Sequence, residues 1–105
     1  MPTLNDALDY MGIDYADEKV SKNAQRALDT AKSVLKGAVG DDVFDLKPDD
    51  DRVKELVLMY TNDLYSERGV SAKVSGAVRK LAHDMELQLR LELKRAREEA
   101  AANAV

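Results

Sequence analysis

Between residues 52 and 68, apolar residues recur three and four positions apart, which is the spacing of one face of an α-helix. Polar residues fill much of the opposite side, while Leu58, Met59 and Tyr65 widen the apolar surface. We therefore predict a helix that several neighbouring elements cover, which makes it the centre of a small bundle. The residues of its main apolar face are Val53, Leu56, Val57, Tyr60 and Leu64.

Three further helices are expected from the same kind of pattern. A short helix follows Thr3, which acts as N-cap with Asp6 in a weak version of the capping box, and Gly12 ends it. A longer helix spans residues 17–38 and carries small alanines that let the central helix approach closely. A fourth begins near Val74. The predicted core contains Leu28, Val34, Leu35, Val53, Leu56, Val57, Tyr60, Leu64, Val78 and Leu81.

The pattern changes over residues 85–93, where apolar and polar residues alternate strictly. A period of two is typical of a half-buried strand. The residue types favour a helix instead, since Leu, Glu, Gln, Arg and Met are helix formers and no β-branched residue occurs. A helix would divide the apolar residues into two stripes, Met85-Leu89-Leu93 and Leu87-Leu91. We interpret the segment as a strand, and the helix remains the alternative.

A strand here has no local partner, so it is expected to seek one in another subunit. The predicted fold is therefore mainly α: a four-helix bundle over residues 1–83, then a docking arm and a flexible charged tail over residues 84–105. The extended part covers about residues 85–93. The residues expected to contact a partner are Met85, Leu87, Leu89, Leu91 and Leu93, with Arg90, Lys94 and Arg95.

Composition narrows the class of protein. A length of 105 residues indicates one domain with a modest core. The net charge of -4 argues against a general nucleic-acid binder, which needs an excess of Lys and Arg on one face. Without cysteine there is no disulfide and no thiolate zinc site. No apolar run approaches the ~20 residues of a membrane span, and the start lacks a signal-peptide pattern.

No residues are spaced to carry a reaction. His83 is the only histidine, and no triad spacing surrounds it. The three aspartates at 49–51 lack the central Gly and later Glu of an EF-hand calcium loop, so we interpret them as the cap of the central helix. We therefore expect no catalytic residue, no metal site and no cofactor, and we do not predict an enzyme.

The last third of the chain is locally basic, and three interpretations are open. These side chains form a solvated face interleaved with glutamates, dock onto an acidic partner, or contact DNA directly. A net-negative protein can still surround DNA, because weak repulsion keeps a passing duplex from sticking. The basic residues are Arg79, Lys80, Arg90, Lys94, Arg95 and Arg97.

Three parts of the chain carry a family resemblance: residues 3–8 with Ile13-Asp14-Tyr15; the central helix, ending in the Tyr-x-x-Arg-like residues 65–68; and Val-Ser-x-Ala-Val-x-x-Leu at 74–81 with Leu-x-Leu at 87–91. Through these parts, over about residues 3–93, the chain resembles the small head–tail connector proteins of tailed bacteriophages. These are also called adaptor or head-completion proteins and are often labelled as possible DNA-packaging proteins. The tail after Leu93 is longer and more charged than that pattern.

The resemblance implies a structural protein of the virion, assembled in the host cytoplasm and located at the head–tail interface. Such connectors form a homo-oligomeric ring, roughly twelve-fold, that docks on the portal protein after DNA packaging. The ring extends the DNA channel, through which DNA passes without specific binding, and offers a platform for the next connector or tail-terminator protein. No membrane is involved. From the residues alone a second interpretation stays open: a small helical regulatory or adaptor module that captures a protein partner through its C-terminal segment.

Overall fold

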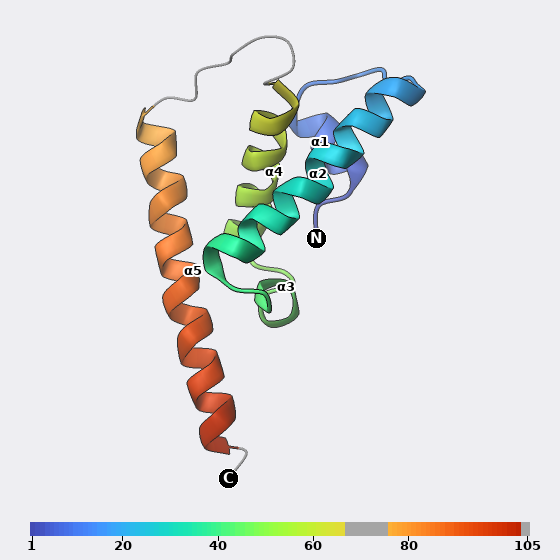
Figure 1. Ribbon diagram of the computed structural model, residues 1–105. Coiled ribbons are helices and arrows are strands. Elements are labelled where there is room, and N and C mark those ends of the chain that lie inside the picture. The colour runs from blue at the N-terminus through green and yellow to red at the C-terminus, as the bar shows by residue number, and fades with distance from the viewer. Residues whose placement is uncertain (67–75, 104–105) are drawn as a thin grey trace.

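The protein is mainly α, as predicted, and the computed structural model describes residues 1–66 and 76–103, without the side chains of residues 66 and 76–78. No strand occurs within these ranges. Figure 1 shows the helices in chain order. They are α1 (Leu4–Tyr10), α2 (Glu18–Val39), α3 (Val43–Leu46), α4 (Asp51–Ser66) and α5 (Gly76–Asn103).

Helices α2 and α4 form the most extensive pair, which confirms the predicted pairing of the second helix with the central one. The buried face of α2 offers Ala24, Ala27 and Ala31, whose small side chains let α4 lie close. α1 packs against both helices, and α5 contacts α2, α3 and α4. The core thus lies between α2 and α4, with α1 and α5 completing it.

Side-chain caps fix where three helices begin. Thr3 accepts a hydrogen bond from the backbone N–H of Asp6, while the Asp6 carboxylate accepts one from the backbone N–H of Thr3, so the predicted capping box forms at α1. Asp17 caps α2 by accepting from Val20 N–H at 2.8 Å. Asp50 accepts from Arg52 N–H at 2.9 Å at the start of α4.

The prediction of an extended segment at residues 85–93 is wrong, because these residues lie inside α5, one continuous helix of 28 residues. The high helix propensity of its Leu, Glu, Arg and Gln prevails over the period-two pattern. The predicted boundary between residues 83 and 84 falls within the same helix. The predicted start near Val74 lies outside the described residues.

The core agrees with prediction for most of its residues. Leu28, Leu35, Val53, Leu56 and Val57 are buried, and Tyr60 and Leu64 pack against them while partly exposed. Placing Val34 and Leu81 in the core is wrong, since their side chains are 46% and 57% exposed. Each lies on a helix face that neighbouring helices do not cover. The side chain of Val78 lies outside those that the structure describes.

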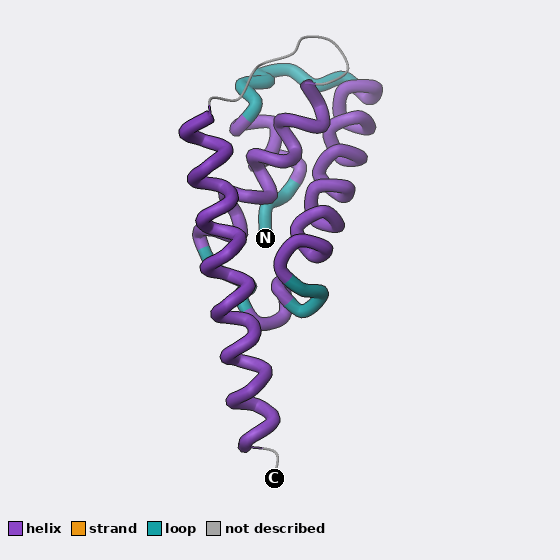
Figure 2. The backbone as a smooth tube through the Cα atoms, turned by 60° about the vertical axis from the view of Figure 1, so that its left-hand side comes forward, coloured by secondary structure: helices purple, strands orange, loops and turns teal. Residues whose placement is uncertain are grey.

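Helix α5 lies along one edge of the molecule. Figures 1 and 2 show it beside the other helices, with its C-terminal turns extending past α3. The molecule is correspondingly elongated, with principal extents of 52 × 30 × 18 Å. One long side of α5 therefore faces the bundle, and the other faces solvent.

Candidate functional site: the outer face of helix α5

The inner stripe of α5 belongs to the core of its own chain. Leu89 and Leu93 are fully buried, Ala82 is nearly so, and Met85 packs against the same cluster. Three of the five apolar residues predicted to dock on a partner, Met85, Leu89 and Leu93, are thus already used within the chain. The structure corrects the prediction for these three, because a helix turns them toward α2 and α4.

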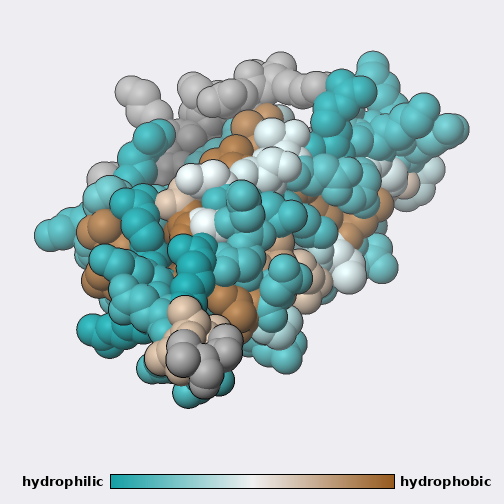
Figure 3. All heavy atoms as spheres, turned by 60° about the horizontal axis from the view of Figure 1, so that its bottom comes forward, coloured by the Kyte–Doolittle hydropathy of each residue, from teal (hydrophilic) through white to brown (hydrophobic). Residues whose placement is uncertain are grey.

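The outer stripe of α5 is open to solvent. Leu87 and Leu91 are 40% and 58% exposed, and Leu81, six residues before Leu87 on the flank of this stripe, is 57% exposed. In Figure 3 hydrophobic side chains stand among hydrophilic ones at the left edge, the side on which α5 lies in Figure 1. Leu87 and Leu91 are the apolar residues of the predicted docking segment that the fold leaves exposed, whereas Leu81 was predicted to lie in the core. We call Leu81, Leu87 and Leu91 the outer leucine face.

A group of ion pairs fastens the middle of α5 to the start of α4. Arg52 donates from Nη2 to Glu92 Oε1 and to Asp50 Oδ2, each at 2.8 Å, and from Nη1 to Glu92 Oε2. Lys47 Nζ lies 2.9 Å from Glu92 Oε1. Arg52 Nη1 also donates to Gln88 Oε1 at 3.2 Å. The guanidinium therefore bridges the cap of α4 and one turn of α5.

These pairs shift the ionisation of the groups that form them. Hydrogen bonds from Arg52, and then from Lys47, lower the pKa of Glu92 to about 2. The hydrogen bond from Arg52 likewise lowers the pKa of Asp50, and the two carboxylates raise the pKa of Arg52. Asp50, Arg52 and Glu92 therefore all keep their charges at neutral pH, and the contacts between α4 and α5 are ion pairs there.

Two further arginines of α5 bind the end of α2 and the turn that follows it. Arg90 donates from Nε and Nη2 to the carbonyl oxygen of Ala38, at 3.1 and 2.8 Å, and so satisfies a carbonyl at the end of α2. Arg97 pairs with Asp42, with Nε donating to Oδ2 at 2.8 Å. Arg90, predicted as a partner contact, is thus engaged within the chain, whereas Lys94 and Arg95 stay exposed.

Sequence reasoning missed this ionic group because Glu92 lies 40 and 45 residues from its partners Arg52 and Lys47. Glu92 was interpreted as the solvent side of a strand, and Asp50 only as a helix cap. A helical register for residues 85–93 would have supplied the signal. In that register Gln88 and Glu92 lie one turn apart on one side of α5, beside the buried stripe.

The outer leucine face is an apolar helix surface with exposed charged side chains beside it. Within the described ranges no group of three or more acidic or histidine side chains is placed to hold a metal ion. His83 is exposed on α5. An apolar helix face bordered by exposed charges is suited to packing against another helix.

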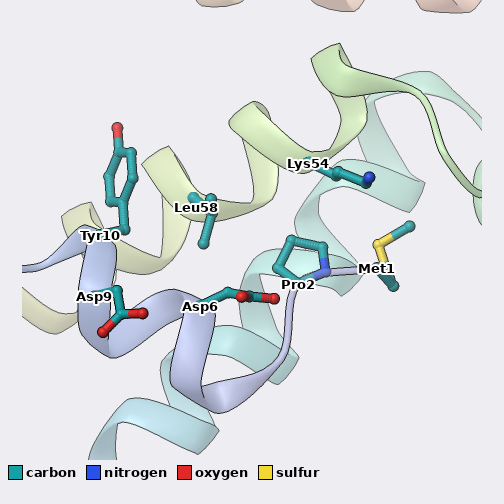
Figure 4. Close-up of a pocket in the computed structure, with 7 residues that line it drawn as sticks. All are labelled: Met1, Pro2, Asp6, Asp9, Tyr10, Lys54 and Leu58. Carbon is teal, nitrogen blue, oxygen red and sulfur yellow. The ribbon is translucent and has the colours of Figure 1, made fainter.

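A hollow of about 580 Å³ lies between α1 and α4, and Figure 4 shows the side chains around it. Asp6 and Tyr10 come from α1, and Lys54 and Leu58 from α4. The Tyr10 hydroxyl donates to Glu55 Oε1 at 3.4 Å, and partial burial together with Glu55 raises the pKa of Tyr10. Because this hollow is open and carries both signs of charge, it indicates no particular ligand.

Comparison with known proteins adds no assignment to this geometry. In the part of the chain that the structure describes, no helix is long and apolar enough to cross a membrane. No protein-family model matches the sequence, and no curated protein and no solved structure matches the chain. The outer leucine face and the sequence motifs are therefore the features of this chain that bear on its function.

Proposed function

We propose that this protein is a structural component of a tailed-bacteriophage virion, a head–tail connector that docks on the portal after DNA packaging. The proposal is supported by the order of the sequence motifs in residues 3–93 and by the outer leucine face of α5. That face is the observation that carries it, because an assembly protein needs a surface that only another polypeptide covers.

Because residues 85–93 are helical, the proposed docking surface is the outer face of α5 and not an extended strand. The buried stripe of α5 and the Arg52–Glu92 pair hold the helix in place, so its outer face is presented in a fixed orientation. Preorganisation of this kind lowers the conformational entropy lost on binding. Covering a half-exposed leucine contributes on the order of 1 kcal/mol, and a ring adds many such contacts.

Exposed charges beside this face give it an electrostatic preference. Lys94 and Arg95 follow Leu91 in the next turn, whereas residues 1–18 contain five carboxylates and no lysine or arginine. These two cations favour an acidic partner surface next to Leu91, although Asp84 and Glu98 lie on the same side of α5, and the acidic body of the protein disfavours DNA adsorption. Both properties suit a ring that binds protein and lets DNA pass.

The same face also fits the second candidate function, a small helical module that captures a protein partner. Helix-in-groove recognition uses apolar anchors three and four residues apart, and Leu87 and Leu91 have that spacing. The two functions differ in the partner rather than in the surface. A test with portal protein therefore separates them.

Electron microscopy of negatively stained protein, alone and mixed with portal, tests the connector role. Rings, or collars on the portal, support it; a chain that ignores the portal at every ratio removes it in favour of the binding module. The variant with both Leu87→Asp and Leu91→Asp should lose collars while keeping its helical content. Val34→Asp, the same change at a comparably exposed site on α2, is the matched control and should keep them.

A further inference from the structure

The outer side of α5 carries a longer pattern than its leucines. Six exposed residues are spaced alternately four and three apart, which is the interval of a coiled-coil seam. Two leucines lie at the centre, and charged residues of opposite sign lie toward each end. All six point away from the buried stripe, which is centred on Leu89. The residues of this seam are Lys80, Asp84, Leu87, Leu91, Lys94 and Glu98.

The seam is complementary to itself when one copy is reversed. In an antiparallel pair centred on residue 89, Lys80 meets Glu98 of the second copy. Asp84 meets Lys94, and Leu87 meets Leu91. Every one of these contacts occurs twice in the pair. The centre coincides with the middle of the 28-residue helix, so the two helices overlap along nearly their whole length.

A parallel arrangement lacks this complementarity. It would set Lys80 on Lys80, Asp84 on Asp84 and Lys94 on Lys94, so that like charges face each other along the seam. Like charges in register are destabilising, whereas opposite charges select the partner and its direction. The charge order of α5 therefore favours the antiparallel pair.

The flanking residues are compatible with the same arrangement. Arg90 lies beside the centre, where two copies would bring like charges together, but its guanidinium is turned to the Ala38 carbonyl oxygen of its own chain. Arg97 is likewise bound to Asp42. On the other flank Leu81 lies opposite Arg95 of the second copy, whose methylene groups are able to cover it.

We propose that the free protein forms an antiparallel homodimer through the outer face of α5, with a second copy of this chain as the occupant of the seam. Four seam leucines form its apolar centre, and four charge pairs set its direction. With so small an apolar centre the dimer is weak and reversible. It covers the outer leucine face until a stronger partner displaces the second copy.

Cysteine cross-linking tests the direction of the pair. The chain has no cysteine, so only introduced thiols form disulfides. Under mild oxidation, a mixture of Lys80→Cys and Glu98→Cys proteins should form a disulfide-linked dimer with one copy of each. Either variant alone should not, because residue 80 of one copy lies roughly 27 Å along the helix from residue 80 of the other. Equal or faster cross-linking of a single variant would overturn the proposal, as would a wild type that sediments as a monomer at every concentration.

Charge exchange tests the pairing itself. Asp84→Lys or Lys94→Asp alone should weaken self-association about tenfold, because each change sets like charges together at two places. The two variants mixed together should form a heterodimer, and the variant that carries both changes should regain wild-type association. Failure of both combinations to recover association contradicts the proposal.

The dimer does not depend on the connector role. If the protein dimerises in this way but does not bind portal, the proposed function is wrong and this inference still holds.

Discussion

Leu89 and Leu91 lie two residues apart in α5, yet Leu89 is fully buried in its own chain and Leu91 is 58% exposed. Two helical residues this far apart differ by about 200° around the axis, so they face opposite sides. One leucine secures the helix to α2 and α4, and the other is free to meet a partner. Leu89 therefore contributes to the stability of the fold, and Leu91 contributes to the proposed binding function.

Alanine substitution should distinguish these roles. Leu89→Ala should lower the free energy of unfolding by about 2–5 kcal/mol, because it leaves a cavity in the core. Leu91→Ala should change it by no more than about 0.5 kcal/mol, as expected for a surface site. Urea denaturation followed by circular dichroism measures both. Equal losses for the two variants would mean that both leucines are covered in the isolated protein.

The sequence predicted the bundle well because its elements are defined locally. The capping box at Thr3 and Asp6 and the apolar face of α4 each depend on residues within a few turns of one another. Exposure at Val34 could not be predicted in this way. Ala27 and Ala31, seven and three residues before it, are buried, but which edge of α2 remains open depends on how the other helices pack.

The error at residues 85–93 has a specific physical cause. Leucine at every second position satisfies a strand that is covered on one face and also a helix that is apolar on two sides. Only the helix propensity of the intervening Glu, Gln and Arg residues distinguishes the two, and here it decides the outcome. In this helix Leu89 and Leu93 are buried, so only Leu87 and Leu91 of the predicted docking leucines remain exposed.

Acid should weaken the attachment of α5 through Glu92. The pKa of Glu92 is lowered to about 2 in the folded protein from an ordinary value of 4.5, so the unfolded chain takes up the proton first as the pH falls. The stabilisation from Glu92 is complete above pH 4.5 and is lost as the pH falls toward about 2. Unfolding free energy measured across this window should decline for the wild type.

Glu92→Gln should lose part of that pH dependence and unfold about 1 kcal/mol more easily at neutral pH, since the pair with Arg52 is partly exposed to solvent. Glu99→Gln, an exposed change on the same helix, is the control and should behave as the wild type. If Glu92→Gln retained the full wild-type pH profile, the ion pairs with Arg52 and Lys47 would not fasten α5.

Gly40 should tolerate no side chain. Its φ of 139° lies in a region that L-residues rarely adopt, and an added Cβ would meet the guanidinium of Arg97. Gly40→Ala should therefore lower the unfolding free energy by more than about 1 kcal/mol. The matched change Gly37→Ala, inside α2 with open space around the new methyl, should raise it by up to about 1 kcal/mol. Thermal unfolding of the two variants tests the contrast in sign.

Removing the hydroxyl of Tyr60 should not destabilise the protein. The side-chain oxygen of Tyr60 is buried without a hydrogen-bond partner among the described residues, while its ring packs against the core. Burying an unpaired hydroxyl is unfavourable, so Tyr60→Phe should leave the unfolding free energy unchanged or raise it by about 1 kcal/mol. Tyr10→Phe, which removes the exposed hydrogen bond to Glu55, should change it by no more than about 0.5 kcal/mol. Chemical denaturation of both proteins is the measurement, and a clear loss of stability in Tyr60→Phe would reveal that the hydroxyl has a partner in solution.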